Sequence, residues 1–96
     1  MDERERYALG DRTRRAVLGD AHVDRSTAAL NDLTSEFYDF VTRAAWGEVW
    51  TRPGLDHDTR RLLVLAITVT ANREREFKLH LGAALAGGVP LDTVKE

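Results

Sequence analysis

The chain has 96 residues, enough for one small domain whose core is thin, so that oligomerisation would be a natural supplement to its stability. It contains no cysteine, which excludes a disulfide framework, a thiolate metal site and a cysteine nucleophile. The net charge is −2 with the two signs interleaved, so no uncompensated basic face for nucleic acid is visible. The longest apolar run, Leu62 to Thr70, is about half a membrane span, and the charged N-terminus does not resemble a signal peptide. We therefore expect a cytoplasmic chain with no nucleic-acid or membrane partner.

Hydrophobic periodicity predicts helices throughout the chain, and hence an all-α fold. A modestly amphipathic helix is expected over Glu3–Leu18, followed by a turn over Gly19–Ser26. From Ser26 to Trp46 the apolar residues recur at steps of three and four, which predicts a helix with one buried stripe. Gly47 to His57 is punctuated by glycine and proline and is expected to be a loop.

The C-terminal half predicts two further helices and the start of another. Asp58 is the expected N-cap of a helix over Thr59–Ala71, which is apolar on nearly every side and is expected to be the central buried helix. Its β-branched residues make a strand conceivable, but no second strand candidate exists to pair with it. A helix over Arg75–Ala86 should end at Gly87–Gly88, and Val89–Glu96 predicts the first turn of another helix.

Glu76 and His80 form the first candidate site, because residues four apart share one face of a helix. A carboxylate in that position could orient the imidazole and bring its pKa toward neutrality, which would make a proton-transfer pair. The alternative is an exposed charge pair of little energetic value, and spacing alone favours this alternative. A metal site is not favoured, because no third ligand is tied to the pair by a recognisable spacing and His22 and His57 lie in expected loops.

Two further groups have both a functional and a structural explanation. Trp46, at the end of one expected helix, and Trp50 and Arg52, in the loop after it, could form the wall of a pocket, with the arginine binding a carboxylate, or could simply close a small core. Arg73 follows the apolar helix, where a cation is also stabilised by the helix dipole without any ligand.

The segments Arg14–Ser26, Ala44–Ala66 and Asn72–Val89, in this order and spacing, resemble the carboxymuconolactone decarboxylase family over essentially the whole chain. The wider alkylhydroperoxidase-like superfamily carries a Cys-x-x-Cys-x-x-x-His signature on the equivalent helix. His80 matches its histidine, whereas Arg73 and Glu76 stand where the two cysteines would be. Peroxidase chemistry needs those thiols, so the resemblance implies the decarboxylase branch, with peroxiredoxin-like activity absent.

The resemblance implies a cofactor-free decarboxylation of 4-carboxymuconolactone (2-carboxy-5-oxo-2,5-dihydrofuran-2-acetate) to 3-oxoadipate enol-lactone, in the protocatechuate branch of the β-ketoadipate pathway. It implies His80 as proton donor or enolate stabiliser, and Glu76 as its orienting partner or as the acid itself. It further implies Arg73 and Arg52 as clamps for the carboxylates, with Trp50 beside them in the substrate-binding loop, and no metal.

Members of this family form symmetric helical oligomers, so a homo-oligomer, trimer or hexamer, is expected. Residues 1–96 are expected to form a single domain that lacks the usual C-terminal helix, and the module could be fused to, or work with, an enol-lactone hydrolase. Two alternatives remain: a member of the family that acts on another small carboxylate or lactone, and a non-catalytic helical assembly module.

Overall fold

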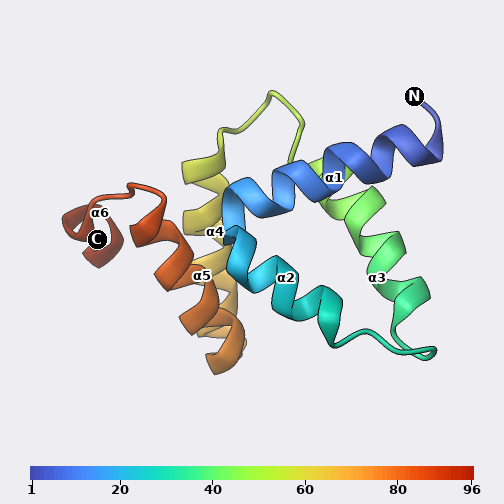
Figure 1. Ribbon diagram of the computed structural model, residues 1–96. Helices are drawn as coiled ribbons and strands as arrows, with labels where there is room; N and C mark the ends of the chain where they lie inside the picture. Colours follow the sequence, from blue (N-terminus) through green and yellow to red (C-terminus); the bar gives the residue numbers. More distant parts are fainter. The chain divides into compact units, whose positions relative to one another are not determined.

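All regular structure in the computed structural model, which describes residues 1–96, is helical, and the predicted all-α fold is confirmed (Figure 1). The chain divides into two compact units, unit 1 (Met1–Pro53) and unit 2 (Gly54–Glu96). None of the helices combines the length and the apolar character that crossing a membrane would require.

Unit 1 begins with two consecutive helices. Helix α1 (Glu3–Leu18) has the predicted bounds and starts in a capping box, in which the Asp2 carboxylate accepts from the Glu5 N–H at 2.8 Å. Helix α2 (Asp20–Ala28) follows after Gly19 alone, whose φ of 91° turns the chain sharply. The predicted turn over Gly19–Ser26 is therefore wrong, and fully buried Val23 fixes the extra helix against the rest of the unit.

The predicted helix from Ser26 to Trp46 is also wrong, because a turn interrupts it. Asn31 accepts hydrogen bonds at its side-chain oxygen from the N–H groups of Leu33 and Thr34, at 2.9 and 3.0 Å, which stabilises a local turn in place of a helix. Helix α3 (Ser35–Val41) then continues directly into η1, a π-helix over Thr42–Val49. The expected loop accordingly covers only the residues from about Trp50 to Asp56.

Helices α1 and η1 cross at backbone contact, and two glycines permit it. A Cβ atom on Gly10 would lie 2.0 Å from the carbonyl oxygen of Thr42, and one on Gly47 would lie 2.4 Å from that of Arg6. Charged pairs flank the crossing: Arg6 contacts Glu48 at 3.1 Å, and Arg43 pairs with Glu3. The buried side chains of the unit include Val17, Val23, Thr42, Trp46 and Trp50.

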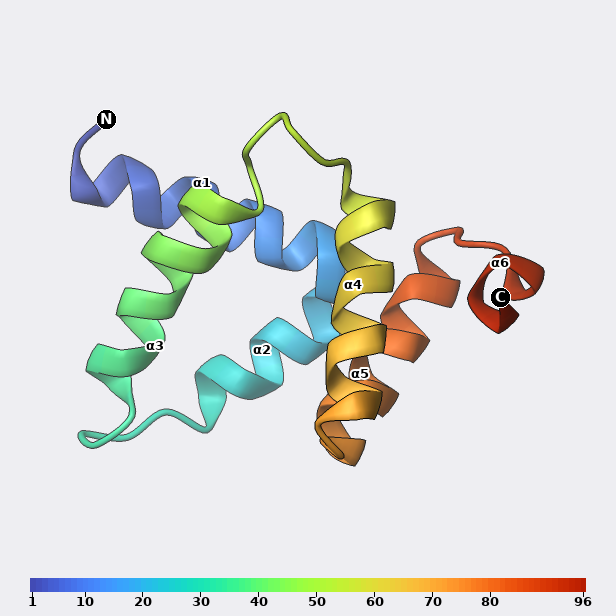
Figure 2. The same cartoon turned by 180° about the vertical axis from the view of Figure 1, so that it is seen from behind.

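Unit 2 consists of a helical hairpin and a short third helix (Figure 2). Helix α4 (His57–Thr70) begins at Asp56, whose carboxylate accepts from the Thr59 N–H at 2.8 Å, so Asp58 is not the N-cap. Helix α5 (Glu74–Ala86) ends at Gly87, and α6 (Leu91–Lys95) forms the predicted extra turn. The periodicity therefore located these helices to within two residues.

The expectation that α4 is buried on nearly every side is wrong for this chain. Leu65 is buried, as are Ala84 and Val89 elsewhere in the unit, but Leu63, Ile67 and Val69 are 49%, 64% and 60% exposed. Within unit 2, one further helix, α5, and the single turn of α6 cannot surround α4, so part of its surface is left open.

Candidate functional site

The predicted acid–base pair lies on α5, one helical turn apart, as the spacing requires. Glu76 is exposed in the first turn, where the helix dipole favours an acidic side chain. His80 is half-buried in the middle of the helix. The two side chains therefore occupy one face of α5, with the imidazole deeper than the carboxylate.

Arg73 lies at the turn that joins α4 to α5, one residue before the helix begins. Its backbone N–H donates to the Thr68 carbonyl at 2.8 Å, and Asn72 before it has a φ of 58°. This left-handed residue ends α4 and sets the direction in which α5 starts. Arg73, Glu76 and His80 are thus brought together on one short segment of unit 2.

A cavity of about 160 Å³ opens beside this turn. Its walls combine polar groups and apolar side chains, namely Thr68, Val69, Asn72, Arg73, Glu74 and Phe77. Arg73 alone of the predicted residues lines it. Sequence reasoning missed the other five lining residues as parts of a site. A turn-forming asparagine directly before an arginine was the available signal for Asn72.

Trp50 and Arg52 lie at the end of η1 in unit 1. The Trp50 ring is 9% exposed and stacks on Trp46, with ring centroids 4.8 Å apart and planes inclined by 29°. The Arg52 side chain is 61% exposed, and its Nη2 atom is 3.6 Å from the Glu48 carboxylate. Trp50 is thus a core residue of its unit, whereas Arg52 presents its guanidinium to solvent.

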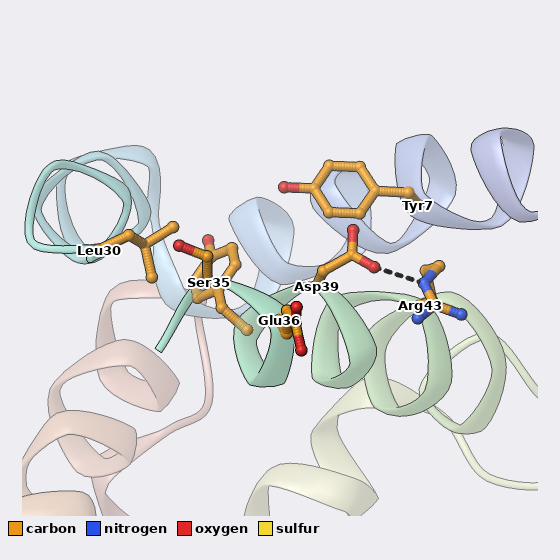
Figure 3. A pocket seen from close by; sticks show the side chains of 7 residues that line it. Tyr7, Leu30, Ser35, Glu36, Asp39 and Arg43 are labelled. Carbon is orange, nitrogen blue, oxygen red and sulfur yellow. Dashed lines mark hydrogen bonds and ion pairs between the residues drawn. The ribbon is translucent and has the colours of Figure 1, made fainter. Parts of the chain in front are cut away.

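A larger hollow, about 650 Å³, opens in unit 1 between α1 and α3 (Figure 3). Asp39 contacts Arg43 there at 2.8 Å, and Glu36 adds a second carboxylate to the wall. The pKa of Tyr7, which points over this hollow, is raised by burial and then by the charges of neighbouring groups, Tyr38, Asp11 and Asp39 among them. The carboxylates make this hollow unfavourable for a dicarboxylate ligand, and none of the predicted site residues lines it.

The chain matches the model of the carboxymuconolactone decarboxylase family over residues 35–96. It is 45% identical over all 96 residues to the 4-carboxymuconolactone decarboxylase of Acinetobacter baylyi, of which it covers 72%. It is 56% identical over 48 residues, half of this chain, to the whole of a 4-carboxymuconolactone decarboxylase of Pseudomonas putida. A nitrosuccinic acid decarboxylase of Metarhizium robertsii is 32% identical over 93 residues, which are 97% of this chain and 65% of that protein. No solved structure matches the chain.

The chain is an all-α protein, and the three relatives named above are all decarboxylases. Its general class is therefore that of helical decarboxylases. Within that class, the chain belongs to the carboxymuconolactone decarboxylase family.

Proposed function

We propose that this decarboxylase, a lyase, converts 4-carboxymuconolactone to 3-oxoadipate enol-lactone and CO₂, within the protocatechuate branch of the β-ketoadipate pathway. The observation that carries the proposal is the identity of 45% across the full chain to a relative named for this substrate. The match to a second such relative, 56% over half of the chain, supports it.

The substrate itself can take up the negative charge that the loss of CO₂ leaves behind. When the bond between the ring carbon and the carboxylate breaks, the electron pair enters the unsaturated lactone, and its carbonyl oxygen takes the negative charge. A proton delivered to the ring carbon then completes the product. The protein has to orient a dicarboxylate, stabilise the dienolate and supply the proton.

His80 and Glu76 suit the proton transfer. The half-buried imidazole would stabilise the dienolate or donate the proton, and the exposed carboxylate one turn earlier would orient it or act as the acid. Arg73, whose cavity in unit 2 has both polar and apolar walls, would bind one substrate carboxylate. Arg52, with its exposed guanidinium, stays the second candidate for binding a substrate carboxylate, and Trp50 would support its loop.

Purified protein mixed with 4-carboxymuconolactone, followed by ultraviolet absorbance and by CO₂ release, tests the proposal. His80→Ala and Glu76→Gln should each reduce turnover by roughly 10²–10⁴ if these groups transfer protons. Lys78→Gln is the matched control on the same helix, because Lys78 is 72% exposed and contacts only Glu74 among the acidic residues, so turnover should be retained. Turnover near wild type in both site variants would reject the assignment of these residues, and no turnover in the parent chain would reject the substrate.

A second candidate substrate is nitrosuccinic acid. The 32% identity over nearly the whole chain to a decarboxylase of this compound is the reason to consider it. Nitrosuccinic acid is also a dicarboxylate that can delocalise the charge left by CO₂, in this case onto its nitro group. The same assay with each compound in turn distinguishes the two proposals, since the higher kcat/KM identifies the preferred substrate.

The exposed apolar side chains support assembly into a homo-oligomer. Phe37 and Phe40 on α3 are 69% and 56% exposed, and Leu63 and Ile67, one turn apart on α4, form a similar surface. Contiguous exposed apolar surface of this kind is typical of protein–protein contact sites. The trimer or hexamer expected from the family would cover it.

A further inference from the structure

The guanidinium group of Arg14 on α1 is covered on several sides but has no hydrogen-bond partner. Its central carbon lies 4.5 Å from the centroid of the Tyr38 ring, a cation–π arrangement. Its Nε and Nη1 atoms are both shielded from solvent, and neither donates to any acceptor. Because a covered charged donor without an acceptor destabilises the folded chain, such a group calls for an explanation such as a bound ion.

The other half-buried arginines of unit 1 are paired differently. Arg6 contacts Glu48 at 3.1 Å. Arg15 contacts three carboxylates at 2.9–3.1 Å, and Arg43 contacts two. Unit 1 therefore has many acidic side chains, yet none of them forms an ion pair with Arg14. The missing acceptor is a feature of this one position.

Beside Arg14 lie the Tyr38 ring and the basic side chain of His22, and no carboxylate forms an ion pair with the guanidinium. The pKa of His22 on α2 is lowered by burial, and further by the nearby positive charges of Arg14 and Arg25. The His22 Nε2 atom is 3.4 Å from the Ser26 hydroxyl, and the Tyr38 hydroxyl is 3.3 Å from that of Thr27. Helices α1, α2 and α3 thus meet around one uncompensated cation.

We propose that Arg14 is the centre of a binding site for a small carboxylate anion in unit 1, with His22 and the Tyr38 hydroxyl beside it. The bound carboxylate would accept from the guanidinium and offset its charge. Arg14 as a whole residue is only half-buried, so part of its side chain is open to solvent. The site is separate from Arg73, Glu76 and His80 and does not depend on the proposed reaction.

Charge selects a carboxylate over a phosphate. The site has one permanent positive charge, and His22 is disposed to remain neutral at physiological pH. Glu36 and Asp39 line the hollow that Tyr38 also borders, and they repel a dianion more strongly than a monoanion (Figure 3).

Titration of the intact chain with sodium acetate, followed by NMR of the histidine rings, tests the proposal, with sodium chloride at equal ionic strength as reference. His22→Gln assigns the His22 signal among the three histidines. Acetate should bind saturably and raise the pKa of His22, because the anion offsets the charge of Arg14. Sodium phosphate should bind more weakly than acetate. Tighter binding of phosphate would overturn the choice of a carboxylate.

Two variants isolate Arg14, and a third is the control. Arg14→Gln should weaken acetate binding about tenfold or more, since it removes the charge. Arg14→Lys keeps the charge without the planar group and should bind with intermediate affinity, which keeps the test decisive if Arg14→Gln does not fold. Arg12→Gln, an exposed neighbour on the same helix, should bind as the parent does. Equal acetate affinity in the parent and the Arg14 variants, or no difference between acetate and chloride, would refute the site.

Discussion

Replacement of Gly10 by alanine tests whether α1 and η1 truly meet at backbone contact. In an exposed helix this change would stabilise the chain by up to about 1 kcal/mol, because glycine is a poor helix former. Here the added Cβ would lie 2.0 Å from the Thr42 carbonyl oxygen, 2.9 Å from the Thr42 carbonyl carbon and 3.0 Å from the Gly47 nitrogen. Helix propensity thus predicts that Gly10→Ala stabilises the chain, whereas the close backbone contact predicts that it destabilises the chain.

The contact decides the sign. A carbon–oxygen contact needs roughly 3.3 Å, so the helices would have to separate by about 1 Å. All three opposing atoms belong to the backbone and cannot rotate away as a side chain would. Overpacking of this kind costs about 1–3 kcal/mol, occasionally more, and this geometry lies at the severe end. After the gain in helix propensity we expect a net loss of about 2 kcal/mol or more.

Urea unfolding followed by far-ultraviolet circular dichroism measures the difference. Gly82→Ala on α5 is the matched control, because a Cβ there meets nothing within 4 Å, and it should stabilise the chain by up to about 1 kcal/mol. If Gly10→Ala is as stable as the parent or more stable, the close crossing of α1 and η1 is refuted.

The remaining predictions concern pH, assembly and the core. The pKa of His22 is lower in the folded chain than its usual 6.5, so just below pH 6.5 the unfolded chain binds more protons than the folded chain. The free energy of unfolding should therefore fall as the pH falls through 6.5. His22→Gln should flatten this pH dependence in urea titrations. An unchanged slope would contradict it. Ile67→Glu should reduce the mass of the proposed homo-oligomer in sedimentation without loss of helix content, whereas Lys78→Glu should leave that mass unchanged. A mass unaffected by Ile67→Glu would argue against α4 as the contact. Trp46→Ala should cost about 3–5 kcal/mol of unfolding free energy, since it removes a buried, stacked ring, and a loss below about 1 kcal/mol would contradict this.

Local signals in the sequence were sufficient where a helix depends on its own residues. Helix α1, with its capping box, and α5, with its terminal glycines, lie within a residue of their predicted bounds. The signals failed where local chemistry or packing opposes the pattern. The Asn31 turn breaks an otherwise continuous amphipathic stripe, and Gly47 becomes helical because η1 packs directly against the α1 backbone.

For the candidate site too, the sequence predicted what local helical spacing determines and missed what depends on the folded structure. Arg73, Glu76 and His80 lie on one short segment because helical spacing alone determines their positions. The cavity beside Arg73 depends on the left-handed backbone of Asn72, which the sequence permits but does not require. Arg14 is one of five arginines among the first twenty residues, and only tertiary structure separates it from the others.

The π-helical hydrogen bonds of η1 depend on the number of residues in this segment as well as on which residues they are. The Trp50 N–H donates to the Ala45 carbonyl, five residues back, at 2.9 Å. Deletion of one residue between 42 and 49 would allow the segment to close as an ordinary α-helix, in which each residue advances by about 100°. Because the π-helical turn holds one more residue than an α-helical turn, removal of that residue leaves Trp50 and Arg52 in nearly the same direction relative to α3. A single-codon deletion here should therefore leave the direction of the following loop almost unchanged, whereas the same deletion inside an ordinary α-helix would rotate everything after it by about 100°.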